Sequence, residues 1–489
     1  MGEAAAMEEA IEASPPPHLH PFTTTKTPKS HQVVSITANP SKEIPESTSA
    51  QPNPLDAWLP ITESRKGNVC TSTFHILCSG IGIQALLLPL AFVALGWTWG
   101  IICLSLAFAW QLYTIWLLVQ LHEPVPGTRY SRYLQLSMAA FGEKLGKVLT
   151  IFPVMYLSGG TCAMLIITGG GTLDLLFTMV HGDGPKPMTG AERYLMFACL
   201  AIVVAQLPNL NSVAGVSLIG AITAIGYCTM IWVLSICKGR PDGVSYDRPD
   251  ATKSDMAGVC GVLNAIGIIA LAFRGHNVVL EIQGTIPTSP KHASKEPMWR
   301  GVTMSYTVIA MCLFPLAIGG YWAYGNMMPT NGGMLNAFSK FHGHKVSNVV
   351  MGIIFLLVLI SSLSSFQVYA MVVFDNLELR YTIKKKKRCP AWLRAVFRVC
   401  FGGLVFFVAV ALPFLPSLAA LIGGMTSPLT FAYPCFMWIA IKRPRPYEPM
   451  WCLNLGLGCL GMVLSALLVA AAVWNLATKG IVANFFHPP

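Results

Sequence analysis

The chain has 489 residues, of which 54% are hydrophobic and 11% are charged, and its mean hydropathy is +0.57. Soluble globular proteins carry about 25% charged residues, so this composition excludes an ordinary soluble protein and favours a chain surrounded largely by lipid. The net charge of +11 would suggest a nucleic-acid partner in a soluble protein. Here the basic residues lie mainly in short segments between apolar stretches, so membrane topology explains them better and no nucleic-acid partner is expected.

Residues 1–55 are polar and rich in Pro, Ser and Thr. Such a segment cannot bury enough apolar area to offset the conformational entropy that is lost on folding. We therefore expect a disordered cytoplasmic tail over 1–55, followed by a transmembrane domain over 56–489. We expect no cleavable signal peptide, so the first membrane helix must itself direct insertion.

The apolar stretches predict an all-α polytopic membrane protein. A membrane-spanning helix needs about 20 mostly apolar residues, and about eleven such stretches follow the tail. The first five make one block over about 70–237, the next five make a second block over about 258–441, and an extra helix follows at about 451–475. The stretches lie near 70–95, 98–121, 148–179, 193–210, 213–237, 258–285, 302–324, 347–374, 396–414, 418–441 and 451–475.

Lys and Arg are distributed unevenly between alternate loops. If the N-terminus is inside, about 23 of the 33 basic residues lie in the tail and the inside loops, and about nine lie outside. Short cytoplasmic loops are enriched in Lys and Arg, so we expect a cytoplasmic N-terminus and an extracellular C-terminus. The basic run at 384–388 is interpreted as a topology signal in preference to a site for lipid headgroups.

The sequence carries no motif for catalysis or metal binding. The 14 cysteines lie almost all inside apolar stretches, where small buried hydrophobes are the expected role and no extracellular disulfide is predicted. No Cys/His spacing suggests a metal site, and no nucleophile motif or phosphate-binding loop is visible. We expect neither an enzyme nor a cofactor.

Glycines interrupt the first apolar stretch. It contains Cys78-Ser79-Gly80-Ile81-Gly82, followed by Gln84. Glycine lets the backbone leave helical geometry, and unwound helix in the membrane frees backbone N–H and C=O groups to bind a substrate. Backbone at Ser79, Gly80 and Gly82 is therefore a candidate for substrate binding. The alternative is close helix packing through small residues.

The sixth stretch is interrupted at the matching place in the second block. It contains Phe273-Arg274-Gly275-His276-Asn277 and then Glu281. Two interruptions at matching positions are the pattern of a five-plus-five inverted repeat with a binding site at the breaks. Charged groups inside a membrane are costly and face a cavity or a partner. Phe273, Arg274, Gly275 and Asn277 are therefore candidates for substrate binding, and His276 and Glu281 are candidates for proton coupling.

The roles of these charged groups leave alternatives open. Arg274 and Glu281 are seven residues apart, so a continuous helix would place them on one face, where they could pair. Such a pair could sense a proton or a substrate charge, or it could be structural. His276 could equally be a satisfied core residue. Polar patches in the third stretch (156–161) and the eighth stretch (361–367) favour helix packing, and Asp174 is expected near water.

Several segments of the chain together carry a family resemblance. They are Trp58-Leu59-Pro60-Ile61-Thr62, Phe74-His75, Leu88-Pro89-Leu90-Ala91, Leu95-Gly96-Trp97, the run from Gly275 to Gln283, Pro287, Met298-Trp299, Gln367-Val368-Tyr369-Ala370, Phe374-Asp375 and Pro434-Cys435-Phe436-Met437-Trp438. Over roughly 56–475 the chain resembles the plant lysine/histidine-type permeases of the amino acid/auxin permease family. The resemblance implies a LeuT-like fold of eleven helices, with the substrate between the first and sixth helices and contributions from the third and eighth. It also implies proton-coupled symport of amino acids at the plasma membrane.

The chain departs from that family at the expected site. Leu90 stands where an aromatic residue is usual, Gln84 and Leu87 where glycine is usual, and Arg274 where a small residue is usual. These departures place the chain in an outlying branch of the family. The extra positive charge of Arg274 could favour acidic amino acids, or it could be neutralised by Glu281. The leading hypothesis is a proton-coupled amino acid importer in the lipid bilayer. The alternatives are a carrier of another small carboxylate, such as an auxin, and a non-transporting amino acid receptor.

Overall fold

The computed structural model describes residues 58–478, with gaps at 126–127, 183–187, 208–209, 211, 248–254, 289–292, 330–331 and 414. The tail expected over 1–55 lies outside the described residues, as does the chain beyond 478. All described residues belong to the second of two units, Ala50–Pro489.

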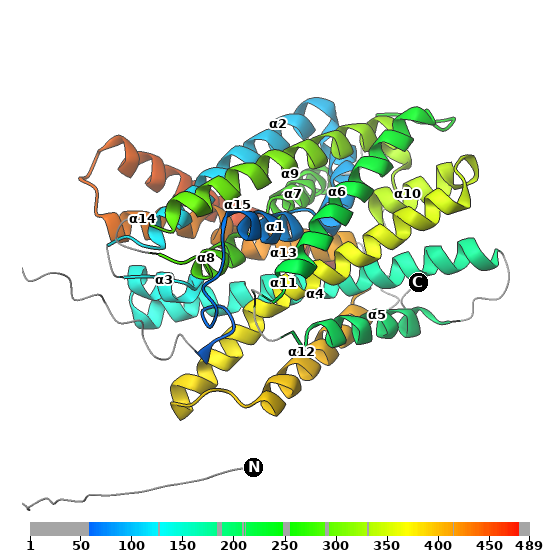
Figure 1. The fold of residues 1–489 in the computed structure, drawn as a ribbon. Coiled ribbons are helices and arrows are strands. Elements are labelled where there is room, and N and C mark those ends of the chain that lie inside the picture. The colour runs from blue at the N-terminus through cyan, green and yellow to red at the C-terminus, as the bar shows by residue number, and fades with distance from the viewer. Residues whose placement is uncertain are drawn as a thin grey trace, which may run out of the picture. The chain divides into compact units, whose positions relative to one another are not determined.

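The described part of this unit is built from helices (Figure 1). Three of the expected spans are divided into shorter helices, and short helices lie between several of the long ones. In chain order the helices are α1 (Val69–Gly80), α2 (Ile83–Leu121), α3 (Tyr133–Phe141), α4 (Glu143–His181), α5 (Gly190–Val204), α6 (Ala214–Cys237), α7 (Asp255–Ala272), α8 (His276–Gly284), α9 (Lys295–Tyr324), η2 (Gly325–Met327), α10 (Gly333–His342), η3 (Gly343–Lys345), α11 (Asn348–Lys385), α12 (Ala391–Ala411), α13 (Leu415–Ser427), η4 (Pro428–Ala432), α14 (Tyr433–Lys442) and α15 (Pro449–Thr478).

Eight helical segments of the described chain are long and apolar enough to cross a membrane. The polytopic all-α class is thus confirmed, whereas the count of eleven spans stays a prediction. The fourth expected span is α5, which has only 15 residues. The tenth is divided into α13, a π-helical turn at η4, and α14. The first two stretches do not meet at a loop, because α2 runs through both with a kink at Gly96, where φ is 72°.

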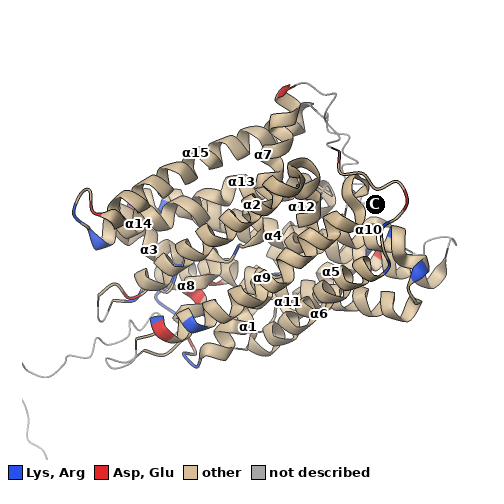
Figure 2. Cartoon of the chain, turned by 90° about the horizontal axis from the view of Figure 1, so that it is seen from above, with Lys and Arg blue, Asp and Glu red and all other residues tan. Residues whose placement is uncertain are grey.

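The outward surface of these helices suits lipid. Leu106, Val148, Val203, Met311 and Val349 are each more than half exposed although they are apolar. Lys, Arg, Asp and Glu gather toward the ends of the helices, and the ribbon between is almost entirely free of them (Figure 2). A bilayer covers exposed apolar side chains of this kind without cost.

The inward faces pack into one continuous apolar cluster. Within it α11 lies against α4 and α6, α2 lies against α7 and α9, and α1 lies against α6 and α9. Since lipid tails are as apolar as leucine, close packing and buried hydrogen bonds hold such helices together. This arrangement encloses α1, α8 and the middle of α11, the segments that carry the candidate residues.

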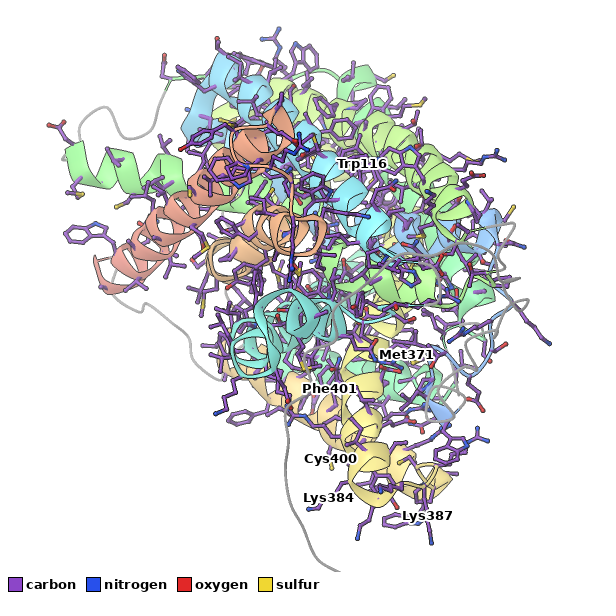
Figure 3. The ribbon with its side chains drawn as sticks, turned by 90° about the vertical axis from the view of Figure 1, so that its left-hand side faces the viewer. Trp116, Met371, Lys384, Lys387, Cys400 and Phe401 are labelled. Carbon is purple, nitrogen blue, oxygen red and sulfur yellow. The ribbon has the colours of Figure 1, made fainter. Side chains whose placement is uncertain are left out.

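The far end of α11 carries the basic run. Figure 3 shows Lys384 and Lys387 at that end, well separated from Met371 in the buried part of the helix. This end of the bundle also holds α3 and the start of α12. We call it the basic end; it is the side that the distribution of Lys and Arg predicts to be cytoplasmic.

Candidate functional site

The first break lies between α1 and α2. Asn68 and Thr71 start α1 with a reciprocal capping box, and the helix ends at Gly80. Ile81 and Gly82 are extended, and α2 begins at Ile83. Gly82 permits a close approach, because a Cβ atom there would lie 2.9 Å from Gln84 Oε1 and 3.4 Å from Arg274 Nη2.

Side chains satisfy the carbonyl groups that the end of α1 leaves free. Ser365 Oγ donates to the Cys78 carbonyl at 2.7 Å, and the Tyr369 hydroxyl donates to the Ser79 carbonyl at 2.8 Å. Gln84 Nε2 donates to the Gly80 carbonyl at 2.7 Å. Buried carbonyl groups need such donors, so α11 and the start of α2 hold the first break in place.

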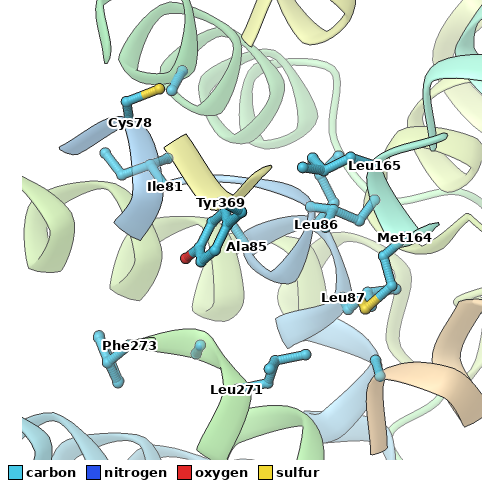
Figure 4. Close-up of a cluster of buried hydrophobic side chains, with 14 of the residues drawn as sticks. Cys78, Ile81, Ala85, Leu86, Leu87, Met164, Leu165, Leu271, Phe273 and Tyr369 are labelled. Atoms are coloured by element: carbon cyan, nitrogen blue, oxygen red, sulfur yellow. The ribbon is translucent and has the colours of Figure 1, made fainter. Parts of the chain in front are cut away.

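The second break lies at residues 273–275, between α7 and α8. Gly275 has φ 146° and ψ −7°. Residues with a Cβ atom rarely adopt this backbone conformation, whereas glycine can. The Tyr306 hydroxyl of α9 donates to the Phe273 carbonyl at 3.1 Å. Figure 4 shows the ring of Tyr369 between the first break, marked by Ile81, and the second, marked by Phe273. The two breaks thus face each other across one aromatic ring.

Arg274 belongs to the second break and is 2% exposed. Its Nη1 donates to Thr161 Oγ1 of α4 at 3.2 Å. The guanidinium carbon stands 4.8 Å from the centre of the Tyr369 ring, which is within range of a cation–π interaction. Its Nε and Nη2 have no acceptor among the described residues. The guanidinium therefore extends from the second break to the first, and two of its nitrogens have no hydrogen-bond partner there.

Side chains of the third and eighth stretches contact the two breaks, while their contribution to substrate binding stays a prediction. Asn277 Nδ2 of α8 donates to Ser158 Oγ of α4 at 2.9 Å, and Thr161 is one turn further along the same helix. From α11 come Ser365 and Tyr369. Helix packing was the favoured interpretation of both polar patches, and part of each patch forms its interhelical hydrogen bonds at the breaks.

His276 is fully buried, and its Nε2 lies 2.8 Å from Thr114 Oγ1 of α2. Its contact is therefore with α2, and its role in proton coupling stays a prediction. A second buried histidine was not singled out from the sequence. His75 of α1 bonds through Nδ1 to Ser217 Oγ of α6 at 2.8 Å.

Glu281 does not pair with Arg274, and the pairing inferred from their spacing is wrong. Arg274 lies in the break and α8 begins only at His276, so the two residues do not share a continuous helix. Glu281 is 2% exposed and its Oε2 has no hydrogen-bond partner among the described residues. It lines a cavity of about 10 Å³ together with Val278, Ile282 and residues of α11, which is room for about one water.

A buried ion pair near Glu281 was missed in the sequence. Arg132, just before α3, contacts Asp375 of α11 through both carboxylate oxygens, at 2.5 and 3.1 Å. The two side chains are 1% and 0% exposed. Asp375 also accepts from the Ile61 backbone N–H at 3.4 Å. Glu281 interacts electrostatically with both members of the pair.

The same region of α11 holds a second ion-pair group. Glu378 lies one turn beyond Asp375 and contacts Arg394 at 2.9 Å and Arg398 at 3.9 Å. Arg388 pairs with Glu63 nearby. Buried ion pairs thus join the start of α3 to α11 and α11 to α12 at the basic end, and the more exposed Arg388–Glu63 pair adds the segment before α1.

The start of α2 and the second half of α4 border a cavity of about 110 Å³. Ile83 and Leu86, at the start of α2, form part of its wall, as do Asn336 of α10 and Asp174 of α4. Asp174 was expected to face water, and it also lies 3.2 Å from Arg193 Nη2. Since Ile83 directly follows Gly82, this cavity approaches the first break.

Among the described residues, no group of three His, Cys, Asp or Glu is placed to hold a metal ion. The described residues bring two backbone breaks and a buried cation close together. A profile of the family described as transmembrane amino acid transporter protein matches residues 65–475. The chain belongs to this family.

Relatives of this transporter are similar over most of their length. It is 54% identical to lysine histidine transporter-like 8 of Arabidopsis thaliana over 439 residues, which cover 89% of this chain and 84% of that protein. It is 50% identical to lysine histidine transporter-like 7 of the same plant, over 89% of this chain and 90% of that protein. The resemblance inferred from the sequence motifs is confirmed, and the relatives are transporters, not enzymes.

One solved structure, of a Na⁺-coupled sialic acid symporter, aligns with 86% of this transporter and 92% of that chain. Its TM-score is 0.47 and its sequence identity is 14%. At such a score and identity, the similarity does not bear on what this transporter carries.

Proposed function

We propose that this transporter is a proton-coupled amino acid symporter of the plasma membrane, a secondary active importer that works by alternating access. The observation that carries the proposal is the facing pair of helix breaks at 81–82 and 273–275. Broken helices in a bundle present backbone groups and helix ends to a small charged substrate. The proposed substrate site comprises Ser79, Gly80, Gly82, Phe273, Arg274, Gly275 and Asn277.

Alternating access requires that the two ends of the site open in turn. The Arg132–Asp375 pair and the Glu378 group join neighbouring segments at the basic end, which supports a site that is closed on that side. The cavity beside Ile83 and Asp174 approaches the first break from the other end. This combination supports a substrate path that enters beside α10 and leaves between α3, α11 and the segment before α1.

Glu281 is the proposed proton carrier. When it is protonated, it is a neutral group that its largely apolar cavity accepts. When it is ionised, its negative charge repels Asp375 and attracts Arg132, the two groups with which it interacts electrostatically. Protonation of Glu281 therefore favours the closed Arg132–Asp375 pair, and loss of the proton weakens it. This links proton release to opening of the basic end. His276 is held by Thr114 and is a second candidate for this role.

Amino-acid-evoked current in oocytes tests the proposal, at acidic and at neutral external pH, with and without sodium. The expected result is an inward current that grows at acidic pH and does not need sodium. A current that requires sodium would contradict proton coupling. Uptake of an auxin-like carboxylate without uptake of any amino acid would favour the other class of carrier. Binding of amino acids without flux, with the protein confirmed at the cell surface, would favour a receptor.

A further inference from the structure

Arg274 differs from every other buried arginine in the described part of the chain. Four further arginines are less than 9% exposed, and each has a carboxylate within 4 Å. They are Arg132, Arg193, Arg394 and Arg398, with Asp375, Asp174, Glu378 and again Glu378 as their partners. Arg274 has no carboxylate at that distance among the described residues, although it is 2% exposed. Its positive charge is therefore uncompensated by the chain that surrounds it.

The groups that face Arg274 are neutral. Thr161 accepts from Nη1, and Tyr369 presents the face of its ring. Cys162 and Tyr227 are the other titratable side chains that interact with it. Glu281, the acidic residue that could have neutralised it, belongs to the group around Arg132 and Asp375.

The first break adds positive potential to that of the guanidinium. Arg274 Nη2 stands beside Gly82, just before the start of α2. The N-terminus of a helix carries about half a positive charge and free backbone N–H groups. Arg274 Nε and Nη2 are unpartnered donors at the same place. Two adjacent N–H donors of a guanidinium match the two oxygens of a carboxylate.

An acceptor stands next to these donors. Gln84 Oε1 is buried and has no hydrogen-bond partner among the described residues. A Cβ atom at Gly82 would lie within 3.4 Å of both Gln84 Oε1 and Arg274 Nη2. The same small region thus offers donors for a carboxylate and an acceptor for an ammonium group.

We propose that Arg274 makes this site selective for amino acids with an anionic side chain, the aspartate and glutamate class. A zwitterionic amino acid has no net charge and leaves the charge of Arg274 uncompensated. A cationic amino acid adds a second positive charge in a region where one is already costly. An acidic amino acid has a net charge of −1 and makes the loaded site neutral, while its ammonium group finds Gln84 Oε1. This inference rests on the proposed function and specifies its substrate.

Competition in the unaltered protein tests the inference without relying on a variant that must fold. Uptake of a labelled neutral amino acid is measured while unlabelled glutamate, aspartate, lysine or indole acetate is added. Glutamate and aspartate should inhibit at concentrations about tenfold or more below that of lysine. The positive side chain of lysine would meet the buried positive charge of Arg274, and such like-charge contacts are costly. Equal inhibition by lysine and glutamate would overturn the inference, as would stronger inhibition by indole acetate, an anion without an ammonium group.

Variants then assign the selectivity to Arg274. Arg274→Gln should reduce the preference for glutamate over the neutral amino acid by about tenfold or more, and Arg274→Lys should restore part of it because the charge returns. Arg240→Gln is the matched control, since Arg240 is exposed and contacts Trp322 at the surface. An unchanged preference in Arg274→Gln would refute the role of Arg274. Uptake of all amino acids alike with proton coupling intact refutes only this inference, whereas no uptake of any amino acid refutes the proposed function.

Discussion

Replacing Asp375 with Asn removes one charge of the buried pair with Arg132 and keeps the shape of the side chain. The guanidinium of Arg132 then loses the carboxylate that it contacts at 2.5 and 3.1 Å. Both side chains are almost completely buried, so water cannot replace the lost partner. Removing one member of a buried ion pair costs about 3–5 kcal/mol, and we expect Asp375→Asn to lower the free energy of unfolding by about that amount.

Unfolding by a denaturing detergent in mixed micelles measures this loss. The double variant Arg132→Gln/Asp375→Asn removes both charges. Its loss of unfolding free energy should be smaller than the sum of the losses in the two single variants by about 1–3 kcal/mol. Glu143→Gln is the control. Glu143 pairs with Lys147 at the surface, where the side chains are 76% and 45% exposed, and exposed pairs contribute little. Its removal should leave the free energy of unfolding nearly unchanged.

Two results would refute the reasoning about this pair. One is a loss of less than about 1 kcal/mol in Asp375→Asn, which is the range of exposed ion pairs. The other is strict additivity in the double variant, because residues that interact directly do not behave independently. Either result would mean that the Arg132–Asp375 contact does not hold the basic end closed.

Three further predictions follow from other parts of the structure. Glu281→Gln imitates the protonated carboxyl, so acidic pH should no longer stimulate uptake while exchange of labelled for unlabelled amino acid continues; retained acid stimulation would exclude Glu281 as the proton carrier. Gly275→Ala should lower the free energy of unfolding by about 1–3 kcal/mol because φ there is 146°, whereas Gly215→Ala, in the open at the start of α6, should not; equal effects would contradict this account of the break. Burial lowers the pKa of His342, whose Nδ1 lies 2.8 Å from the Tyr324 hydroxyl, so the folded state takes up a proton less readily than the unfolded chain. Stability should therefore fall as pH drops below about 6.5, and His342→Gln should flatten that dependence in unfolding measured at stepwise pH; an unchanged profile would refute it.

The positions of the two breaks could be predicted from the sequence because they depend on local residue types. Gly80 and Gly82 interrupt one apolar stretch, and Gly275 with its polar neighbours interrupts another. Charged groups are rare inside membrane helices, and glycine lets the backbone leave helical geometry, so the two together indicate a functional interruption. The structure has helix ends at both places.

The partners of the charged groups could not be predicted in the same way. Arg274 and Glu281 were treated as neighbours on a continuous helix, and the break at Gly275 removes the basis for that spacing. Arg132 was counted only as a topology signal, because nothing local links it to Asp375, which is 243 residues away. Contacts between helices depend on packing that helical periodicity along one chain does not specify.

The division into spans was predicted best where the apolar runs were long. The stretch expected at 148–179 is α4, Glu143–His181, and the one at 213–237 is α6, Ala214–Cys237. The predicted end of the stretch at 70–95 was wrong, because Gly96 kinks α2 without ending it. Short amphipathic helices such as α10 were not predicted, because they are too short to give a continuous apolar run.

Proton-driven accumulation in liposomes tests the central claim most directly. The purified transporter is reconstituted without sodium, a pH gradient that is acidic outside is imposed, and uptake of labelled glutamate is followed with and without a protonophore. The account predicts transient accumulation above equilibrium that the protonophore abolishes and that Glu281→Gln lacks. Glutamate exchange without any accumulation driven by the pH gradient would contradict proton coupling.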